Sequence, residues 1–244
     1  MWNGLCVVLN GESLLLDVSG AAFWPAERTL IFADLHLEKG SSYARGRQFL
    51  PPYDSQATLM RMAAAVTRFN PKRIIALGDS FHDREAAERL SPDARAMLAA
   101  LAAEFVWISG NHDPAPPAWL GGMVTAVWSA GGLTFRHEPQ ADHAPGEIAG
   151  HLHPCAQVAK WGRRVRRRCF AADGARMILP SFGAYTGGLD VGEDAIARLF
   201  GARFHAYMLG SDRVYAIPRT QVGRRKITDD IQPMISAMMT AARP

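Results

Sequence analysis

Three short apolar runs constrain the fold most strongly, because each ends directly on side chains that can bind a metal or a substrate. The runs at 29–33, 73–77 and 105–108 predict buried strands. Helical patterns at 54–69 and 91–104 separate them. Strands that alternate with helices form α/β folds, and ligands of such sheets gather at the carboxyl ends of the strands. We therefore expect an α/β fold with a site at that edge.

Local patterns predict the remaining elements. The dipeptide Asn10-Gly11 is a strong two-residue turn signal, so 5–9 and 13–18 predict a β-hairpin. Segment 37–54 carries basic residues and a proline pair and is predicted to be a long loop. Strand-like runs in the second half lie at 124–128, 133–136, 147–149, 165–171, 177–179, 206–209 and 214–217. A helix is expected near 193–200, and a Met-rich amphipathic helix at 229–242 suits either core packing or a homodimer contact.

Residues that commonly act as metal ligands follow the predicted strands. They are Asp34-x-His36, Gly78-Asp79, Gly110-Asn111-His112-Asp113, His137 and Gly150-His151-Leu152-His153. Each has an ordinary explanation by itself, since Gly-Asp at a strand end is usually a turn and a single histidine usually belongs to the core or surface. Together they supply nitrogen and oxygen donors that suit divalent Mn, Fe or Zn.

Composition limits the compartment and the organisation of the chain. The 244 residues are 48% hydrophobic and show no composition break, which favours a single domain over 1–244. We see no signal peptide and no run long enough to span a membrane. The three cysteines, an odd number without C-x-x-C spacing, argue against a disulfide framework or a structural zinc site. A reducing cytoplasm fits best.

The basic residues are clustered although the net charge is only +4. One cluster comprises Lys160, Arg163, Arg164, Arg166, Arg167 and Arg168, and another comprises Arg224, Arg225 and Lys226. Such density favours a polyanionic partner, while a solvated basic hairpin predicts the same composition.

The strand-end blocks resemble those of the calcineurin-like metallophosphoesterases, whose five blocks read Asp-x-His, Gly-Asp, Gly-Asn-His-Asp/Glu, His and Gly-His-x-His. All five occur in order between residues 34 and 153. The segments at 34–40, 50–54 and 179–188 are similar to one branch, the bacterial DNA ligase-associated metallophosphoesterases. The resemblance implies a four-layer α/β sandwich, in which two mixed β-sheets pack face to face between helices.

The resemblance also implies a pair of metal sites. One cation would be held by Asp34, His36, Asp79 and His153, and the other by Asp79, Asn111, His137 and His151. Asp79 would bridge them, because a carboxylate can give one oxygen to each of two cations. Two-metal hydrolases use such a pair to stabilise charge on phosphoryl oxygens and to activate water for in-line attack. Mn is the expected metal, and Fe and Zn accept the same ligands.

Two residues beside the ligand Asn111 are assigned catalytic roles by the same resemblance. His112 would act as general acid or electrostatic donor toward the departing oxygen, and Asp113 would orient it and favour its protonated form. Many members of the superfamily have Asp three positions after the bridging residue, whereas this chain has His82. His82 is either a contact near the substrate or a solvent-facing loop histidine.

Several residues could contact a substrate beyond the scissile phosphate. Arg45 and Arg47 could reach flanking phosphates, and Tyr43, Phe49 or Tyr53 could stack on an exposed base. A lid over a small phosphodiester would use the same residues. If Arg164, Arg166 and Arg168 share one face of a strand, they would form a stripe that binds a nucleic-acid backbone, although a charged edge strand predicts the same pattern.

The leading hypothesis is a binuclear phosphodiesterase or endonuclease that acts on single-stranded or damaged DNA in repair, in functional association with DNA ligase and helicase. One alternative is a small-molecule phosphodiesterase or phosphomonoesterase. Another is a non-catalytic module that binds DNA or a repair complex. The intact ligand set argues against the module, because a degraded site should have lost at least one ligand. The sequence leaves open the native metal, the choice between endonuclease and exonuclease action, the physiological substrate and the oligomeric state.

Overall fold

The computed structural model describes residues 4–48, 50–51, 53–101, 103–142, 145–160, 163–201 and 203–223. The predicted helix at 229–242 and the basic cluster at 224–226 lie outside the described residues.

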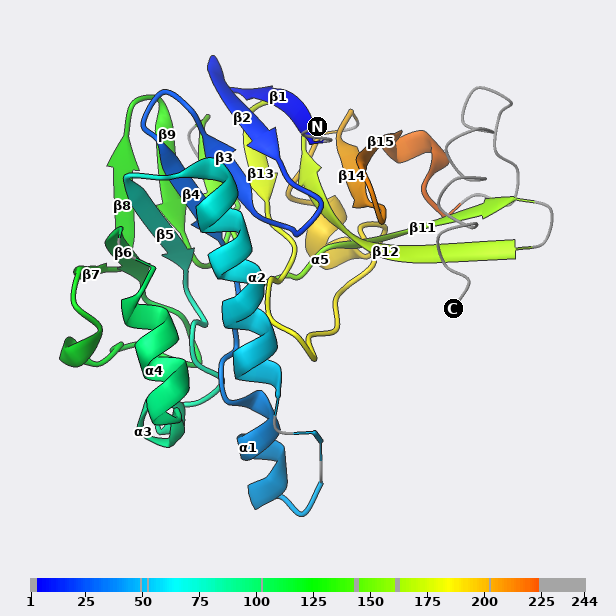
Figure 1. Ribbon diagram of the computed structural model, residues 1–244. Coiled ribbons are helices and arrows are strands. Elements are labelled where there is room, and N and C mark those ends of the chain that lie inside the picture. The colour runs from blue at the N-terminus through cyan, green and yellow to red at the C-terminus, as the bar shows by residue number, and fades with distance from the viewer. Residues whose placement is uncertain are drawn as a thin grey trace.

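The first of two mixed β-sheets carries the three strands that the sequence analysis began with (Figure 1). Its strand order is β1-β2-β3-β4-β5-β6-β7, antiparallel from β1 to β4 and parallel from β4 to β7. The strands are β1 (Leu5–Leu9), β2 (Glu12–Leu16), β3 (Ala22–Trp24), β4 (Thr29–Phe32), β5 (Arg73–Leu77), β6 (Glu104–Ile108) and β7 (Met123–Thr125). The parallel half brings the carboxyl ends of β4, β5 and β6 to one edge.

The second sheet has the order β15-β14-β12-β13-β10-β9-β8, and β11 pairs with β12 outside this path. Its central strands β9, β10 and β13 are parallel, and its other pairs are antiparallel. The strands are β8 (Val127–Ala130), β9 (Leu133–Arg136), β10 (Glu147–Ala149), β11 (Cys155–Lys160), β12 (Arg163–Ala172), β13 (Arg176–Ile178), β14 (His205–Leu209) and β15 (Val214–Pro218).

The described part of the chain contains five helices and two 3-10 turns, some of which cover the outer faces of the sheets. They are α1 (Lys39–Arg45), α2 (Asp54–Phe69), α3 (Ala86–Arg89), α4 (Pro92–Ala99), α5 (Asp194–Ala197) and the 3-10 turns η1 (Ala118–Leu120) and η2 (Arg219–Gln221). The apolar faces of α2 and α4 pack on the first sheet, and Ile196 of α5 packs on the second. The Ser91 hydroxyl caps α4 by accepting from Ala94 N at 3.2 Å. None of the described helices combines the length and hydropathy needed to cross a bilayer.

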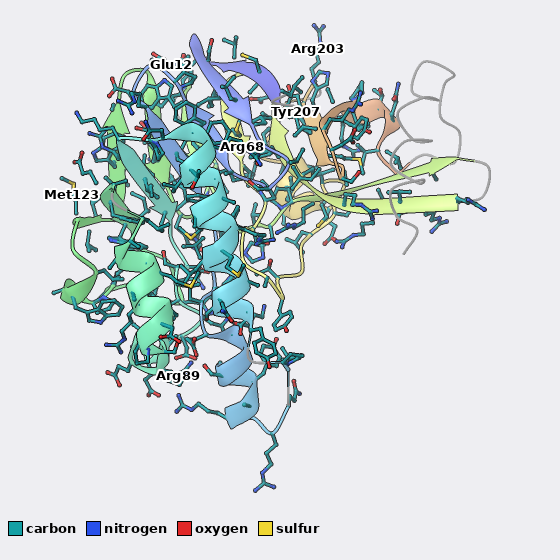
Figure 2. The ribbon with its side chains drawn as sticks, viewed as in Figure 1. Glu12, Arg68, Arg89, Met123, Arg203 and Tyr207 are labelled. Atoms are coloured by element: carbon teal, nitrogen blue, oxygen red, sulfur yellow. The ribbon has the colours of Figure 1, made fainter. Side chains whose placement is uncertain are left out.

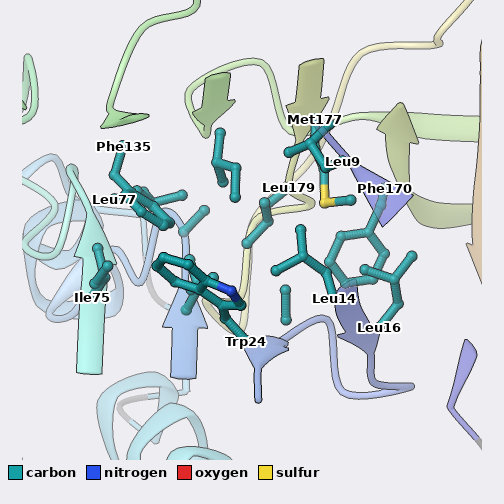
Figure 3. Close-up of a cluster of buried hydrophobic side chains, with 14 of the residues drawn as sticks. Leu9, Leu14, Leu16, Trp24, Ile75, Leu77, Phe135, Phe170, Met177 and Leu179 are labelled. Carbon is teal, nitrogen blue, oxygen red and sulfur yellow. The ribbon is translucent and has the colours of Figure 1, made fainter. Parts of the chain in front are cut away.

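The main apolar core lies between the two sheets. Leu14 and Leu16 alternate with outward residues along β2, as expected for a strand with one buried face. Figure 3 shows these leucines meeting Phe170 and Met177 of the second sheet, with Trp24 in the same cluster. The indole of Trp24 is buried and donates to Glu12 Oε2 at 2.9 Å, which satisfies its polar group. The predicted fold class, a sandwich of two mixed sheets between helices, is confirmed.

Four local predictions were incomplete or wrong. The predicted loop at 37–54 contains helix α1. The run predicted as one strand at 124–128 is divided between β7 and β8, which belong to different sheets. Helix α4 ends at Ala99, earlier than predicted, and strands β3 and β11 were not predicted. Helix α1 was missed because its sequence has no apolar period. Contacts with the α3 region stabilise it instead, since Arg89 Nε donates to Ser41 Oγ at 2.9 Å.

Candidate dinuclear metal centre

All seven predicted ligands meet where the carboxyl ends of five strands converge. Asp34 and His36 follow β4, Asp79 follows β5, and Asn111 follows β6. The second sheet supplies the other three ligands, which are His137 after β9 and His151 and His153 after β10. Both sheets therefore contribute ligands, and each ligand lies in the segment that directly follows the end of a strand.

Three of the ligands form a first group of donors. His153 Nε2 lies 3.3 Å from Asp34 Oδ1 and 3.4 Å from His36 Nε2. Each of the three residues has a potential ligand atom, and these three atoms lie within 4.8 Å of one another. Burial lowers the pKa of His36 well below its usual value, and His153 adds to this effect, so the imidazole is neutral and can offer a lone pair.

A second group of donors surrounds His137. Its Nε2 lies 2.8 Å from Asn111 Oδ1, 3.1 Å from His151 Nδ1 and 3.4 Å from Asp79 Oδ2. The same Asp79 oxygen lies 4.0 Å from His36 Nε2 in the first group. Asp79 thus stands between the two groups, as the predicted bridging role requires.

Hydrogen bonds behind the second group determine which histidine nitrogen faces inward. His137 Nδ1 donates to the Leu77 carbonyl at 3.0 Å, which leaves Nε2 as the ligand atom. His151 Nε2 lies 3.3 Å from Glu138 Oε1, which leaves Nδ1. Sequence reasoning missed Glu138, whose only signal is its place beside the predicted ligand His137. Convergence of ring nitrogens on carboxylate and amide oxygens fits divalent cations, so the residues present suit the two cations that the sequence resemblance implies.

The backbone at this site is held in a conformation that L residues seldom adopt. Five of the seven ligands have left-handed φ angles between 43° and 68°, namely Asp34, His36, Asp79, His151 and His153. Such strain persists only where surrounding contacts over-determine it. Here His36 N donates to Asp79 O at 2.9 Å, and His151 N donates to the Asp34 carboxylate at 3.0 Å.

Glycines make room for these ligands. A Cβ on Gly78 would lie 2.5 Å from the His137 ring, and one on Gly110 would lie 2.2 Å from Asp79 Oδ1. A Cβ on Gly150 would lie 2.6 Å from Asp34 Oδ2. Each glycine of the Gly-Asp, Gly-Asn and Gly-His blocks is therefore needed where the backbone approaches a ligand of another block.

His112 lies at the mouth of the centre. Its side chain is 39% exposed, and its Nε2 is 3.9 Å from Asp79 Oδ2. Its backbone N–H donates to Asp79 Oδ1 at 2.9 Å, and its Nδ1 donates to the His82 carbonyl at 2.6 Å. Nε2 is consequently the ring atom that is available to a substrate.

The predicted contact between Asp113 and His112 is replaced by a different one. Asp113 is buried and accepts from Ser80 N at 2.9 Å and from Phe81 N at 3.1 Å, so it fixes the turn that follows Asp79. Burial raises the pKa of Asp113 to about 7. The His82 carbonyl performs the orienting function that the sequence analysis gave to Asp113. This correction arises because the Ser80–Phe81 turn offers two buried N–H donors that a carboxylate satisfies well.

His82 belongs to a stack of rings beside the centre. Its ring centroid lies 5.3 Å from that of His112 and 5.9 Å from that of Tyr43, with interplanar angles of 23° in both cases. Its Nδ1 lies 3.4 Å from His36 Nδ1. Burial and the nearby Lys39 lower the pKa of His82 to about 4. Of the two interpretations left open for His82, the structure favours the one that places it at the site.

The four predicted arginine contacts lie farther out. Arg45 pairs with Glu85 on the exposed side of α1, and Arg47 is exposed just beyond that helix. Arg166 donates to the Gly188 carbonyl at 2.5 Å, and Arg168 donates to the Ser181 carbonyl at 2.7 Å. The structure therefore brings the metal ligands and His112 together, and their roles in catalysis and the roles of the arginines stay predictions.

Comparison with known proteins gives a family match over the region that contains the ligand blocks. The calcineurin-like phosphoesterase family model matches residues 27–179, a range that contains every residue of the centre. The chain belongs to this family. Among solved structures, this calcineurin-like phosphoesterase is similar to the crystal structure of Pseudomonas putida nuclease MPE, with 29% identity and a TM-score of 0.67. The match covers 88% of this chain and 100% of that chain. No curated protein sequence matches significantly. The protein is thus a metal-dependent phosphoester hydrolase.

Proposed function

We propose that this calcineurin-like phosphoesterase is a binuclear endonuclease that cleaves phosphodiester bonds in single-stranded DNA and acts in DNA repair. The observation that carries the proposal is the gathering of the seven ligands into two groups with Asp79 between them, and with His112 at the open side. The structural similarity extends over the full length of the Pseudomonas putida protein, which is described as a nuclease, and this similarity supports a polynucleotide substrate.

Each group of the centre has a task in the proposed reaction. Two divalent cations held by these ligands would supply Lewis-acid stabilisation of the phosphoryl oxygens and an activated water for in-line attack. His112 Nε2 faces the open side of the centre, where it can give its proton to the departing oxygen as the P–O bond breaks. The His82 carbonyl holds Nδ1–H at 2.6 Å and so directs Nε2 toward that oxygen.

Incubation of purified protein with circular single-stranded DNA tests the proposal, because a circle has no ends for an exonuclease. We expect linear product with added Mn²⁺ and none with a chelator. A circle that stays intact with Mn²⁺, Fe²⁺ and Zn²⁺, while a bis-aryl phosphate is hydrolysed, would mean a small-molecule phosphodiesterase. Preference for a mono-aryl phosphate would mean a phosphomonoesterase.

His112→Ala tests the proposed proton donor. We expect the variant to keep both metals and to lose about 10²–10⁴-fold in DNA cleavage, the range typical of a general acid. Aryl phosphates should lose less, because their leaving groups need less protonation. Metal content and the rates on both substrates are the measurements, and unchanged DNA cleavage would remove His112 from the mechanism.

A further inference from the structure

The hairpin of β11 and β12 projects from the body of the protein (Figure 1). Its first strand begins at Cys155, two residues after the metal ligand His153. The β12 segment at 169–172 pairs with β14, whereas the described partner of segment 163–168 is β11 alone. We call residues 155–160 and 163–168 the arm. The arm is thus joined directly to the metal centre and extends beyond the second sheet.

The arm carries positive charge that nearby carboxylates leave unpaired. Arg163, Arg164 and Arg166 are exposed and Arg167 is half-buried. Among the described residues, no carboxylate lies within 4.0 Å of these four guanidinium groups, although Arg45, Arg89 and other arginines of the protein have such partners. Unpaired guanidinium groups on a projecting element are available for a polyanion.

The strand register arranges three arginines in a row. Arg168, Arg166 and Arg164 are opposite Cys155, Gln157 and Ala159, so they share one face of the arm. Alternate residues of a strand are about 6.6 Å apart. Ala159, which is opposite Arg164, is six residues beyond His153, so it is at most about 20 Å from that ligand.

The inner end of this row is anchored to the metal centre. Arg168 and Arg166 donate to the carbonyls of Ser181 and Gly188, and Gly183 N between them donates to the carbonyl of the ligand Asp34 at 3.0 Å. The row therefore runs outward from the centre, with Arg164 as its exposed member without a described partner. The alternative role of the arm is that of a charged edge strand that prevents aggregation. That role does not require the arm to begin beside a metal ligand or to carry exposed arginines without carboxylate partners at its outer end.

We propose that the arm is a track for a single nucleic-acid strand, which holds the phosphates of nucleotides that flank the cleaved bond. This inference rests on the proposed nuclease function and adds where the strand runs. An extended strand that leaves the centre along the arm meets Arg166 and then Arg164, so binding should strengthen with oligonucleotide length until the strand reaches Arg164.

Binding without cleavage separates this inference from the nuclease proposal. Fluorescence anisotropy of labelled single-stranded oligonucleotides of increasing length, in chelator, measures affinity for the full-length protein. The variant is Arg164→Glu, and the matched control is Arg203→Glu, an exposed arginine just before β14 that is labelled in Figure 2. Hydrolysis of a bis-aryl phosphate with metal present checks that the remote substitutions leave the centre intact.

We expect severalfold weaker binding of long oligonucleotides by Arg164→Glu, unchanged binding of those too short to reach the arm, and no change for Arg203→Glu. Arg164→Ala should lower the slope of log affinity against log salt by about 0.7, the value for one phosphate contact on a single strand. Equal effects of the two charge reversals would overturn the track. So would binding of phosphatidylserine vesicles without binding of oligonucleotides. Failure to cut circular DNA would contradict the nuclease function instead.

Discussion

Three glycines explain, at the scale of single residues, why three of the five blocks of this site have their particular form. Gly78, Gly110 and Gly150 precede the ligands Asp79, Asn111 and His151, and each stands where a Cβ would meet another ligand side chain. The position of the ligands after apolar runs is visible in the sequence. The need for these glycines is not, because only the folded chain shows which side chain each one faces.

Gly110→Ala tests this packing. The new Cβ would lie 2.2 Å from both the backbone N and Oδ1 of Asp79, so the bridging carboxylate must move. We expect the protein to fold and to lose activity by about a hundredfold, since displacements near 1 Å commonly cost that much. The rate on a bis-aryl phosphate and the metal content after dialysis are the measurements.

Gly187→Ala is the matched control, because a Cβ at that exposed position meets no described atom within 4 Å. It should retain wild-type rates and metal content. Full activity in Gly110→Ala would show that the site tolerates a shifted Asp79.

At the scale of elements, the best predictions had a local cause and the failures had a tertiary one. Asn10-Gly11 forms the β1–β2 turn, and the apolar period at 54–69 becomes α2. Helix α1 instead depends on contacts such as Arg89 with Ser41, and β7 and β8 separate because the chain passes from one sheet to the other. The ligand set could be predicted, but the partner of His112 could not, since a backbone carbonyl of His82 has no sequence signature.

Arg168 illustrates a change in interpretation at this scale. Its sequence position predicts a DNA-binding stripe with Arg164 and Arg166. In the structure its side chain is half-buried and donates to the Ser181 carbonyl of the segment that packs on Asp34. Arg168→Ala should therefore cost about 1.5–3 kcal/mol of unfolding free energy, the range for a hydrogen bond to a charged group. It should slow DNA cleavage and bis-aryl phosphate hydrolysis by similar factors.

Denaturant unfolding and the two rates measure these effects. Arg164→Ala is the comparison, since it should affect DNA alone. If Arg168→Ala slowed DNA cleavage but not bis-aryl phosphate hydrolysis, Arg168 would be a substrate-binding residue, as the sequence predicted.

At the scale of the whole molecule, a buried ion pair links the second sheet to its surroundings. Arg176 on β13 is fully buried, and its Nε lies 2.5 Å from Glu147 Oε2 on the neighbouring strand β10. The same guanidinium donates to the Leu199 carbonyl at 2.6 Å and to the Gln140 carbonyl. Nothing in the sequence indicated this pair, because charged residues rarely occupy such positions and only their pairing makes burial tolerable.

Arg176→Met should destabilise the protein by about 3–5 kcal/mol, because Glu147 would lose its closest described cation while remaining buried. The midpoint of urea unfolding measures the loss. Arg176→Met combined with Glu147→Leu should recover part of it. A single variant as stable as the wild type would mean that the pair adds nothing to the fold.

The central claim is that Asp79 joins two metal sites, and metal stoichiometry tests it most directly. Chelator-treated protein titrated with Mn²⁺ in a calorimeter should bind two cations per chain in the wild type. His36→Ala should retain one of them, because His36 belongs to the first donor group and not to the group around His137. Asp79→Ala should weaken both, since the same oxygen lies 4.0 Å from His36 Nε2 and 3.4 Å from His137 Nε2. A single cation in the wild type, or equal retention in Asp79→Ala and His36→Ala, would contradict the account.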